Sequence, residues 1–367
     1  MKIFSILILS FSFVAAGEFS VKKEDLKPSG WSEPSVPVEK EEISVYKSVK
    51  LYAFEKEARD AGKKTAEEFE NLGVSVIGVN VFEKDGDYGF SLEYLPVLKD
   101  PEKMSSFILK KYKSPASYWN RSLAETAAKE SENFFSLSPL KSLEVSVVEG
   151  ENYSFSLTYY AKNLLKKSEV YYAALGKVSL GEFTFENQAN QNAQILLNKL
   201  KNAGFAAFNA YPVESGENWK VEIEYFYKTD KQKTERPEYS PKTYESASVY
   251  NFEKDALSQA HNAILSLPGG VFPLAVYAAE KGGNWSFFID YAVKNLYLKE
   301  KTLPEYEIKK YFNPETFTFE SEAKKAMEEK FLSFLKNGLY PLDKEVTEKD
   351  GEYGFYIDYF SKNSQNL

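Results

Sequence analysis

The feature that most constrains this chain is a ten-residue pattern that occurs five times. GDYGFSLEYL at 86–95 and GEYGFYIDYF at 351–360 are two copies, and related segments begin at 150, 216 and 282. The tyrosines near the ends of the copies are spaced 65, 66, 66 and 68 residues apart: Tyr94, Tyr159, Tyr225, Tyr291 and Tyr359. Five copies at nearly constant spacing predict a tandem array of small, similar structural units.

A second recurring feature, an alanine upstream of each copy, predicts one helix per unit. The alanines are Ala58, Ala124, Ala189, Ala256 and Ala323. In most units small or apolar residues follow at positions 4, 8 and 11, which lie on one face of a 3.6-residue helix. Gly73, Gly204 and Gly338 follow at position 15, where a left-handed glycine ends a helix. Four alanines have a phenylalanine four residues earlier, and Ala124 has Asn120 there instead: Phe54, Phe185, Phe252 and Phe319.

The repeated ten residues themselves predict a strand. In the last copy Tyr353, Phe355, Ile357 and Tyr359 alternate with more polar positions, which indicates one face on a helix and the other nearer water. The pairs at 85–86 and 350–351 are Asp-Gly, which suits the tight turn of a β-hairpin. The preceding runs at 74–82 and 339–346 are therefore predicted to be partner strands.

The predicted fold class is α+β, with five tandem strand-helix-strand-strand repeats of about 66 residues, each a small antiparallel-rich sheet covered by one helix. One helix on one sheet is marginally stable at this size, so neighbouring units are expected to pack together or pair. The predicted ranges are a signal peptide at 1–16, a flexible leader at 17–40, and repeats at 41–98, 106–164, 169–229, 238–297 and 304–363.

The N-terminus predicts export. Lys2 precedes an apolar run from 3 to 14, and two alanines precede Gly17, as a signal peptidase requires. We therefore expect an extracytoplasmic protein, periplasmic or secreted, that is soluble after signal-peptide removal and has no integral membrane segment. The chain has no cysteine, which excludes disulfides and thiolate metal sites.

Charge and composition argue against several kinds of chemistry. The formal net charge of −8 disfavours a nucleic-acid partner, because phosphate binding needs a clustered basic surface. His261 is the one histidine, and no G-x-S-x-G sequence surrounds any serine. Zinc sites of the His/Cys type are excluded by count. We predict no catalytic residue, no metal site and no cofactor.

Carboxylates are the most plentiful remaining candidates for catalysis. Glu93, Glu224, Asp290 and Asp358 recur one residue before the closing tyrosine, and the second copy has Thr158 there. A glycosidase needs two carboxylates converging in one cleft. A repeated acid on a sheet face more often serves solubility and protection of the sheet edge, and we expect that role here.

The sequence also offers a candidate contact surface, which consists of Tyr160, Tyr171, Tyr172, Tyr227, Tyr239, Tyr244, Tyr356 and Asp358. Exposed tyrosines stack on sugars or anchor protein contacts. They also pack between repeats, and that role is favoured for the tyrosines outside the core pattern because an array needs interfaces. We therefore expect a non-enzymatic binding or scaffolding module with a protein partner. The alternatives are a polysaccharide or cell-wall glycan ligand and a carboxylate-dependent hydrolase. The second repeat departs most from the pattern, through either drift or a specialised contact surface.

Overall fold

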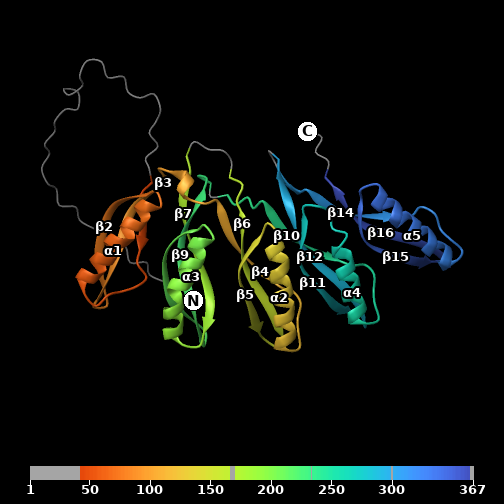
Figure 1. Ribbon diagram of the computed structural model, residues 1–367, viewed down its shortest axis with the longest axis horizontal. Helices are drawn as coiled ribbons and strands as arrows, with labels where there is room; N and C mark the ends of the chain where they lie inside the picture. The colour runs from red at the N-terminus through yellow and green to blue at the C-terminus, as the bar shows by residue number, and fades with distance from the viewer. Residues whose placement is uncertain (1–41, 166–169, 233, 299–300, 364–367) are drawn as a thin grey trace, which may run out of the picture. The chain divides into compact units, whose positions relative to one another are not determined.

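A computed structural model describes residues 42–165, 170–232, 234–298 and 301–363 of this chain (Figure 1). The predicted signal peptide (1–16) and leader (17–40) lie outside these residues. Within them, no helix combines the length and the apolar composition that crossing a membrane requires.

The predicted fold class is confirmed, since the described residues form α+β units that each contain one helix and three main strands. We number the units 1 to 5 by the predicted repeats. The helices are α1 (Glu55–Asn71), α2 (Arg121–Leu137), α3 (Glu186–Asn202), α4 (Glu253–Ile264) and α5 (Glu320–Lys336). The first strands are β1 (Ser44–Lys47), β4 (Phe107–Lys113), β7 (Tyr172–Phe183), β10 (Tyr239–Glu245) and β14 (Tyr306–Phe312). The second strands are β2 (Val74–Lys84), β5 (Lys141–Glu149), β8 (Ala206–Ser215), β11 (Val271–Lys281) and β15 (Tyr340–Lys349). The third strands are β3 (Asp87–Leu98), β6 (Tyr153–Lys162), β9 (Asn218–Thr229), β12 (Asn284–Tyr297) and β16 (Glu352–Lys362).

The third strand is the centre of each sheet. It pairs antiparallel with the first strand on one side and the second on the other, as in the order β14-β16-β15. The first and second strands therefore run parallel, and the helix that joins them crosses one face of the sheet (Figure 1). Two short elements complete the description, the strand β13 (Thr302–Pro304), which pairs with β12, and the 3₁₀ helix η1 (Pro101–Lys103).

The predicted helix face is the buried one. The anchor alanine is fully buried in all five helices, and the large residue at position 11 is buried in four of them, as Phe69 and Phe135 illustrate. In unit 4 that residue, Leu267, lies beyond the end of α4 and is half-buried. Pro268 follows it and disfavours helical geometry at the preceding residue, so this helix is shorter than the others.

The predicted turns are also present. Asp85 and Gly86 have φ of 54° and 88°, and Asp350 and Gly351 have φ of 55° and 79°. Positive φ at both central residues is the type I′ geometry whose twist matches the two strands of a hairpin. The glycine after α1, Gly73, has φ of 83°, as a left-handed helix end requires.

The units contact one another in an order that differs from their order along the chain. One apolar cluster joins unit 1 to residues of unit 3 such as Phe208, and a second joins unit 3 to residues of unit 2 such as Leu143. A third joins unit 2 to unit 4 through Leu274, and a fourth joins unit 4 to unit 5 through Leu342. The order of contacts is therefore 1–3–2–4–5, and units 1 and 3 also share one strand pair between β3 and β7.

These contacts correct one expectation about the sheets. The sheet face turned away from the helix was predicted to lie nearer water, and in units 2 to 5 it is covered by the neighbouring unit. In unit 5 the alternate residues of β16, Tyr356, Asp358 and Phe360, are all buried. The reason is that a layer of about 60 residues buries too little apolar surface alone, so units 1 to 4 each cover the second sheet face of a neighbour.

Candidate binding surface

The repeated acids are the residues that join the units. Glu224, Asp290 and Asp358 are only 1%, 2% and 3% exposed, so they do not lie at the surface as the sequence suggested. Each accepts a hydrogen bond from a first-strand tyrosine of the covering unit. Tyr46 Oη donates to Glu224 Oε2 at 2.7 Å, Tyr112 donates to Asp290, and Tyr244 Oη donates to Asp358 Oδ2 at 2.9 Å.

We use two names for the surfaces that meet at these contacts. The acid face of a unit is the sheet side turned away from its own helix, which carries the recurring acid. The tyrosine face of a unit is the side of its helix and sheet core on which the hydroxyl group of the first-strand tyrosine lies. Three of the four contacts between units pair a tyrosine face with an acid face through a hydrogen bond to a carboxylate.

The contact between units 3 and 2 lacks this pair on both sides. The first-strand position of unit 3 that corresponds to Tyr46 by register is Val178, and the recurring acid of unit 2 is replaced by Thr158. Instead Gly181, at a bulge of β7, donates its backbone N–H to Glu144 Oε1 at 2.6 Å. An acid with no donor opposite would cost several kcal/mol to bury, so the paired replacement favours contact between these two units.

Burial dominates the electrostatics of these groups. It raises the pKa of the Asp290 carboxyl, and hydrogen bonds from Thr243 and Tyr112 only partly oppose that shift. It also raises the pKa of the Glu144 carboxyl, against the hydrogen bond from Gly181. The pKa of the Tyr112 hydroxyl rises through burial and the nearby charge of Asp290, so this hydroxyl stays a proton donor. Burial is therefore the largest influence on the pKa of each of these three groups.

The hydrolase hypothesis requires two carboxylates close together, and one pair of buried acids meets that requirement. Asp343 and Asp358 are register partners on β15 and β16, and both are buried. Their oxygens are already engaged, because Ser248 Oγ donates to Asp343 at 2.8 Å and Tyr244 donates to Asp358. Neither carboxylate lines the hollows described below, so the pair has the arrangement of a contact between units 4 and 5.

The eight residues of the predicted contact surface lie at or beside such contacts. Tyr244, Tyr356 and Asp358 are buried and therefore present no outer surface. The five others are half-buried. Tyr160 packs on Phe107 and Phe205, Tyr171 packs against the cluster of units 1 and 3, Tyr172 pairs with Val97, Tyr227 packs beside Tyr225, and Tyr239 packs on Phe272.

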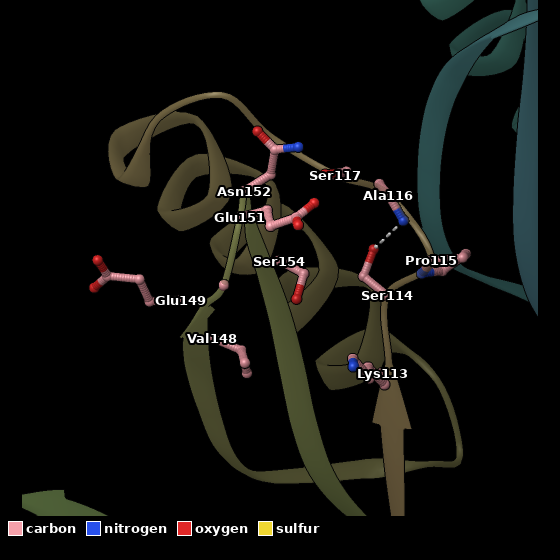
Figure 2. A pocket seen from close by; sticks show the side chains of 11 residues that line it. Lys113, Ser114, Pro115, Ala116, Ser117, Val148, Glu149, Glu151, Asn152 and Ser154 are labelled. Carbon is pink, nitrogen blue, oxygen red and sulfur yellow. Dashed lines mark hydrogen bonds between the residues drawn. The ribbon is translucent and has the colours of Figure 1, made fainter. Parts of the chain in front are cut away.

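One hollow lies in unit 2 (Figure 2). It has a volume of about 550 Å³ and lies between residues 113–117 and the β5–β6 turn at 148–152. Serines, Asn152 and Glu151 line it, and Ser114 Oγ accepts from the Ala116 N–H at 3.2 Å. The side chain of Glu149 points away from the other labelled residues (Figure 2). A second hollow of about 140 Å³ lies between units 2 and 3 beside Tyr227. Lys113, Glu149 and Glu151 are among the residues that line the first hollow, and Lys177 and Glu235 are among those that line the second.

His261 has a structural partner. Its Nε2 lies 2.8 Å from Glu130 Oε1 on α2, so it links the helices of units 4 and 2 at the surface. Burial lowers the pKa of this imidazole, but the hydrogen bond and charge of Glu130 outweigh it and the pKa is raised. Among the described residues, no group of three or more His, Asp or Glu side chains is arranged to hold a metal ion.

The prominent exposed side chains are aromatic residues at the starts of the helices. Phe54, Phe185, Phe252 and Phe319 are the N-cap residues of α1, α3, α4 and α5, and 60–66% of each is exposed. In unit 2 the N-cap is Asn120, whose side chain accepts from the Leu123 N–H at 2.9 Å. Trp119, one residue earlier, is 79% exposed. Every unit therefore presents one large aromatic at the same end of its helix.

Local folding does not explain these aromatics. Ser, Thr, Asp and Asn are strongly preferred at an N-cap because their side chains accept from an unpaired backbone N–H. The four phenylalanine caps make no such hydrogen bond. Their recurrence was visible in the sequence, but it was assigned to the helix pattern because spacing alone does not reveal that these rings point to solvent.

Comparisons with known proteins add no relative: no family model, no curated protein and no solved structure matches the chain.

Proposed function

We propose that this chain is a non-enzymatic, extracytoplasmic binding or scaffolding protein that holds a protein partner through the exposed aromatics at its helix N-termini. These five residues form what we call the cap aromatics: Phe54, Trp119, Phe185, Phe252 and Phe319. The observation that carries the proposal is their recurrence, once per unit, at positions where the helix itself favours a small polar residue.

Energetics support a binding role. An exposed large aromatic buries little surface in the folded chain but supplies a large apolar contact when a partner covers it, and such residues dominate protein interfaces. Replacing a cap phenylalanine by serine should stabilise its helix by about 0.5–2 kcal/mol. The chain has four such unfavourable N-caps. Departures from local residue preferences of this kind are common at functional sites.

The non-enzymatic part of the proposal rests on the carboxylates. The recurring acids of units 3, 4 and 5 lie in three separate contacts between units, each engaged by a tyrosine hydroxyl. A hydrolase requires two carboxylates open to one substrate cleft, and this arrangement does not favour it.

Site-specific photo-crosslinking tests the proposal. A photoreactive phenylalanine analogue placed at Phe54, Phe185 or Phe319 should crosslink one protein species in the native envelope or culture fluid. The matched controls are Leu137 and Leu265, which are 80% and 83% exposed near the other ends of their helices. Equal crosslinking from the controls would contradict the proposal. So would partner capture by a variant with all cap aromatics changed to serine.

The same variant separates a glycan ligand from a protein partner. If the wild-type chain sediments with purified cell-wall fragments and the serine variant does not, while no crosslinked protein appears, the cap aromatics bind sugar rings. That result would replace the protein partner by the polysaccharide alternative.

A further inference from the structure

The order of contacts leaves two faces without a neighbouring unit in the described chain. Unit 1 covers unit 3, but no described unit covers the acid face of unit 1. Unit 5 is covered by unit 4, while its own core cluster contains residues of unit 5 alone. One end of the series therefore has an open acid face, and the other has an open tyrosine face.

The acid face of unit 1 carries the same features that the covered acid faces bury. Each second strand has a bulge with a large apolar residue beside the position of the recurring acid, which is Thr158 in unit 2. In units 2 to 5 this residue is at most 6% exposed: Leu143, Phe208, Leu274 and Leu342. Its counterpart in unit 1, Ile77, is 51% exposed. The adjacent acid Glu93 is half-exposed and has only a 3.5 Å contact from Asn80.

The tyrosine face of unit 5 carries the complementary features. Tyr311 occupies the position of Tyr46, Tyr112 and Tyr244, but it is half-exposed and its hydroxyl donates to Asn313 of its own unit at 3.2 Å. Tyr359 is the one closing tyrosine that is not buried. Lys330 Nζ lies 4.8 Å from the centre of the Tyr311 ring, which adds a positive charge to this face.

We propose that the chain associates head to tail with a second copy of itself, with the tyrosine face of unit 5 seated on the acid face of unit 1 of the next copy. Tyr311 then donates to Glu93, as three tyrosines already donate to acids within the chain, and Lys330 faces the same carboxylate. Ile77 fills the site that Leu342 fills between units 4 and 5. The contact continues the interface that already joins the units.

Such an interface is heterologous, because the two surfaces that meet are different. Repeating it generates a closed ring or an open filament. The proposal rests on residues other than the cap aromatics, so it fails separately from the proposed function.

Sedimentation of the purified protein tests this association. As the protein concentration increases from about 1 to 300 µM, the weight-average mass of the wild-type protein should rise above the mass of one chain, because dimers and larger species form. Ile77→Asp and Lys330→Glu should each weaken association by about 10-fold or more, because each places a negative charge in the contact. Ile195→Asp and Lys63→Glu are matched controls on exposed helix faces, and they should behave like the wild type.

A mixture of the two variants gives the sharpest result. Ile77→Asp retains an intact tyrosine face and Lys330→Glu retains an intact acid face, so an equimolar mixture should form dimers and nothing larger. A wild-type chain that stays monomeric would overturn the proposal. The acid face of unit 1 would then have another occupant, such as residues 17–41 or a different protein. Association that either variant leaves unchanged would also overturn it, as would larger species in the mixture.

Glu93→Gln removes the charge of the proposed acceptor and Tyr311→Phe removes the donor hydroxyl, each with little change in shape. Each variant alone should weaken association by about 3- to 10-fold. The double variant should associate at most about 3-fold more weakly than Tyr311→Phe alone. Urea unfolding of each variant checks that the monomer remains folded. Fully additive losses would contradict a direct Tyr311–Glu93 contact.

Discussion

Removing the hydroxyl of Tyr112 tests whether the buried tyrosine–acid pairs stabilise the contacts between units. Tyr112→Phe deletes one oxygen and leaves Asp290, which is 2% exposed, with the Thr243 hydroxyl at 2.6 Å as its remaining side-chain donor. A hydrogen bond to a charged group contributes about 1.5–3 kcal/mol. We therefore expect the free energy of unfolding to fall by about 2 kcal/mol at pH 7.

The chain supplies its own control for this change. Tyr311 occupies the equivalent position in unit 5, and its hydroxyl contacts only Asn313, at 3.2 Å. In dilute protein, where copies do not associate, Tyr311→Phe should cost no more than about 0.5–1 kcal/mol. Urea unfolding followed by tryptophan fluorescence measures both variants, and Trp285 reports on unit 4, against whose core it packs.

Two further measurements decide the cause. The double variant Tyr112→Phe, Asp290→Thr reproduces the uncharged pairing found between units 3 and 2, and it should recover about 1–2 kcal/mol relative to Tyr112→Phe. The cost of Tyr112→Phe should also shrink towards pH 3, where Asp290 is protonated and needs no donor. Equal costs at the two tyrosines, or no coupling to Asp290, would refute the reasoning.

Four other variants give three further predictions. Because burial raises the pKa of Asp290 above 3.8, its stabilising contribution is present below that pH and is lost as pH rises through the native value. The stability advantage of Asp290→Asn should therefore grow over that range in urea titrations. Gly89→Ala should cost about 1 kcal/mol or more, since its Cβ would lie 2.3 Å from the Phe82 ring, whereas Gly354→Ala meets nothing closer than 3.7 Å and should be nearly neutral. The raised pKa of His261 means that its ion pair with α2 stabilises the fold below pH 6.5 and is lost as pH rises through the native value. His261→Gln should remove that pH dependence, which is at most about 0.5 kcal/mol for so exposed a pair.

Local features of the fold were predictable because they repeat within short stretches of sequence. The period of 65 to 68 residues gave the units, the alanine spacing gave the helix face, and Asp-Gly gave the hairpin turns. Each of these depends on residues close together in the chain, and the array repeats the signal five times. The early end of α4 follows from Pro268, which is also a local signal.

The arrangement of the units was not predictable, because it depends on single residues far apart in sequence. The recurring acids were expected on a solvated sheet face, since an alternating strand does not show whether another unit covers it. Thr158 and Val178 look like separate departures from the pattern until the structure places units 2 and 3 together. Packing between units was the favoured role for the candidate tyrosines, but spacing alone could not name the units that they join, and the cap aromatics were overlooked.

The order in which the units contact one another has a consequence for folding as the chain is synthesised. When the chain emerges with its N-terminus first, unit 2 follows unit 1. Unit 3, the neighbour that unit 1 covers in the folded chain, has not yet appeared at that point. Unit 3 must then enter between two units that are already complete. Any early contact between units 1 and 2 would set Tyr46 over Thr158, which lacks the carboxylate of its native partner, so such a contact should dissolve readily. Correct assembly of the N-terminal half therefore depends on the insertion of unit 3. That insertion should be the slowest phase when the whole chain refolds.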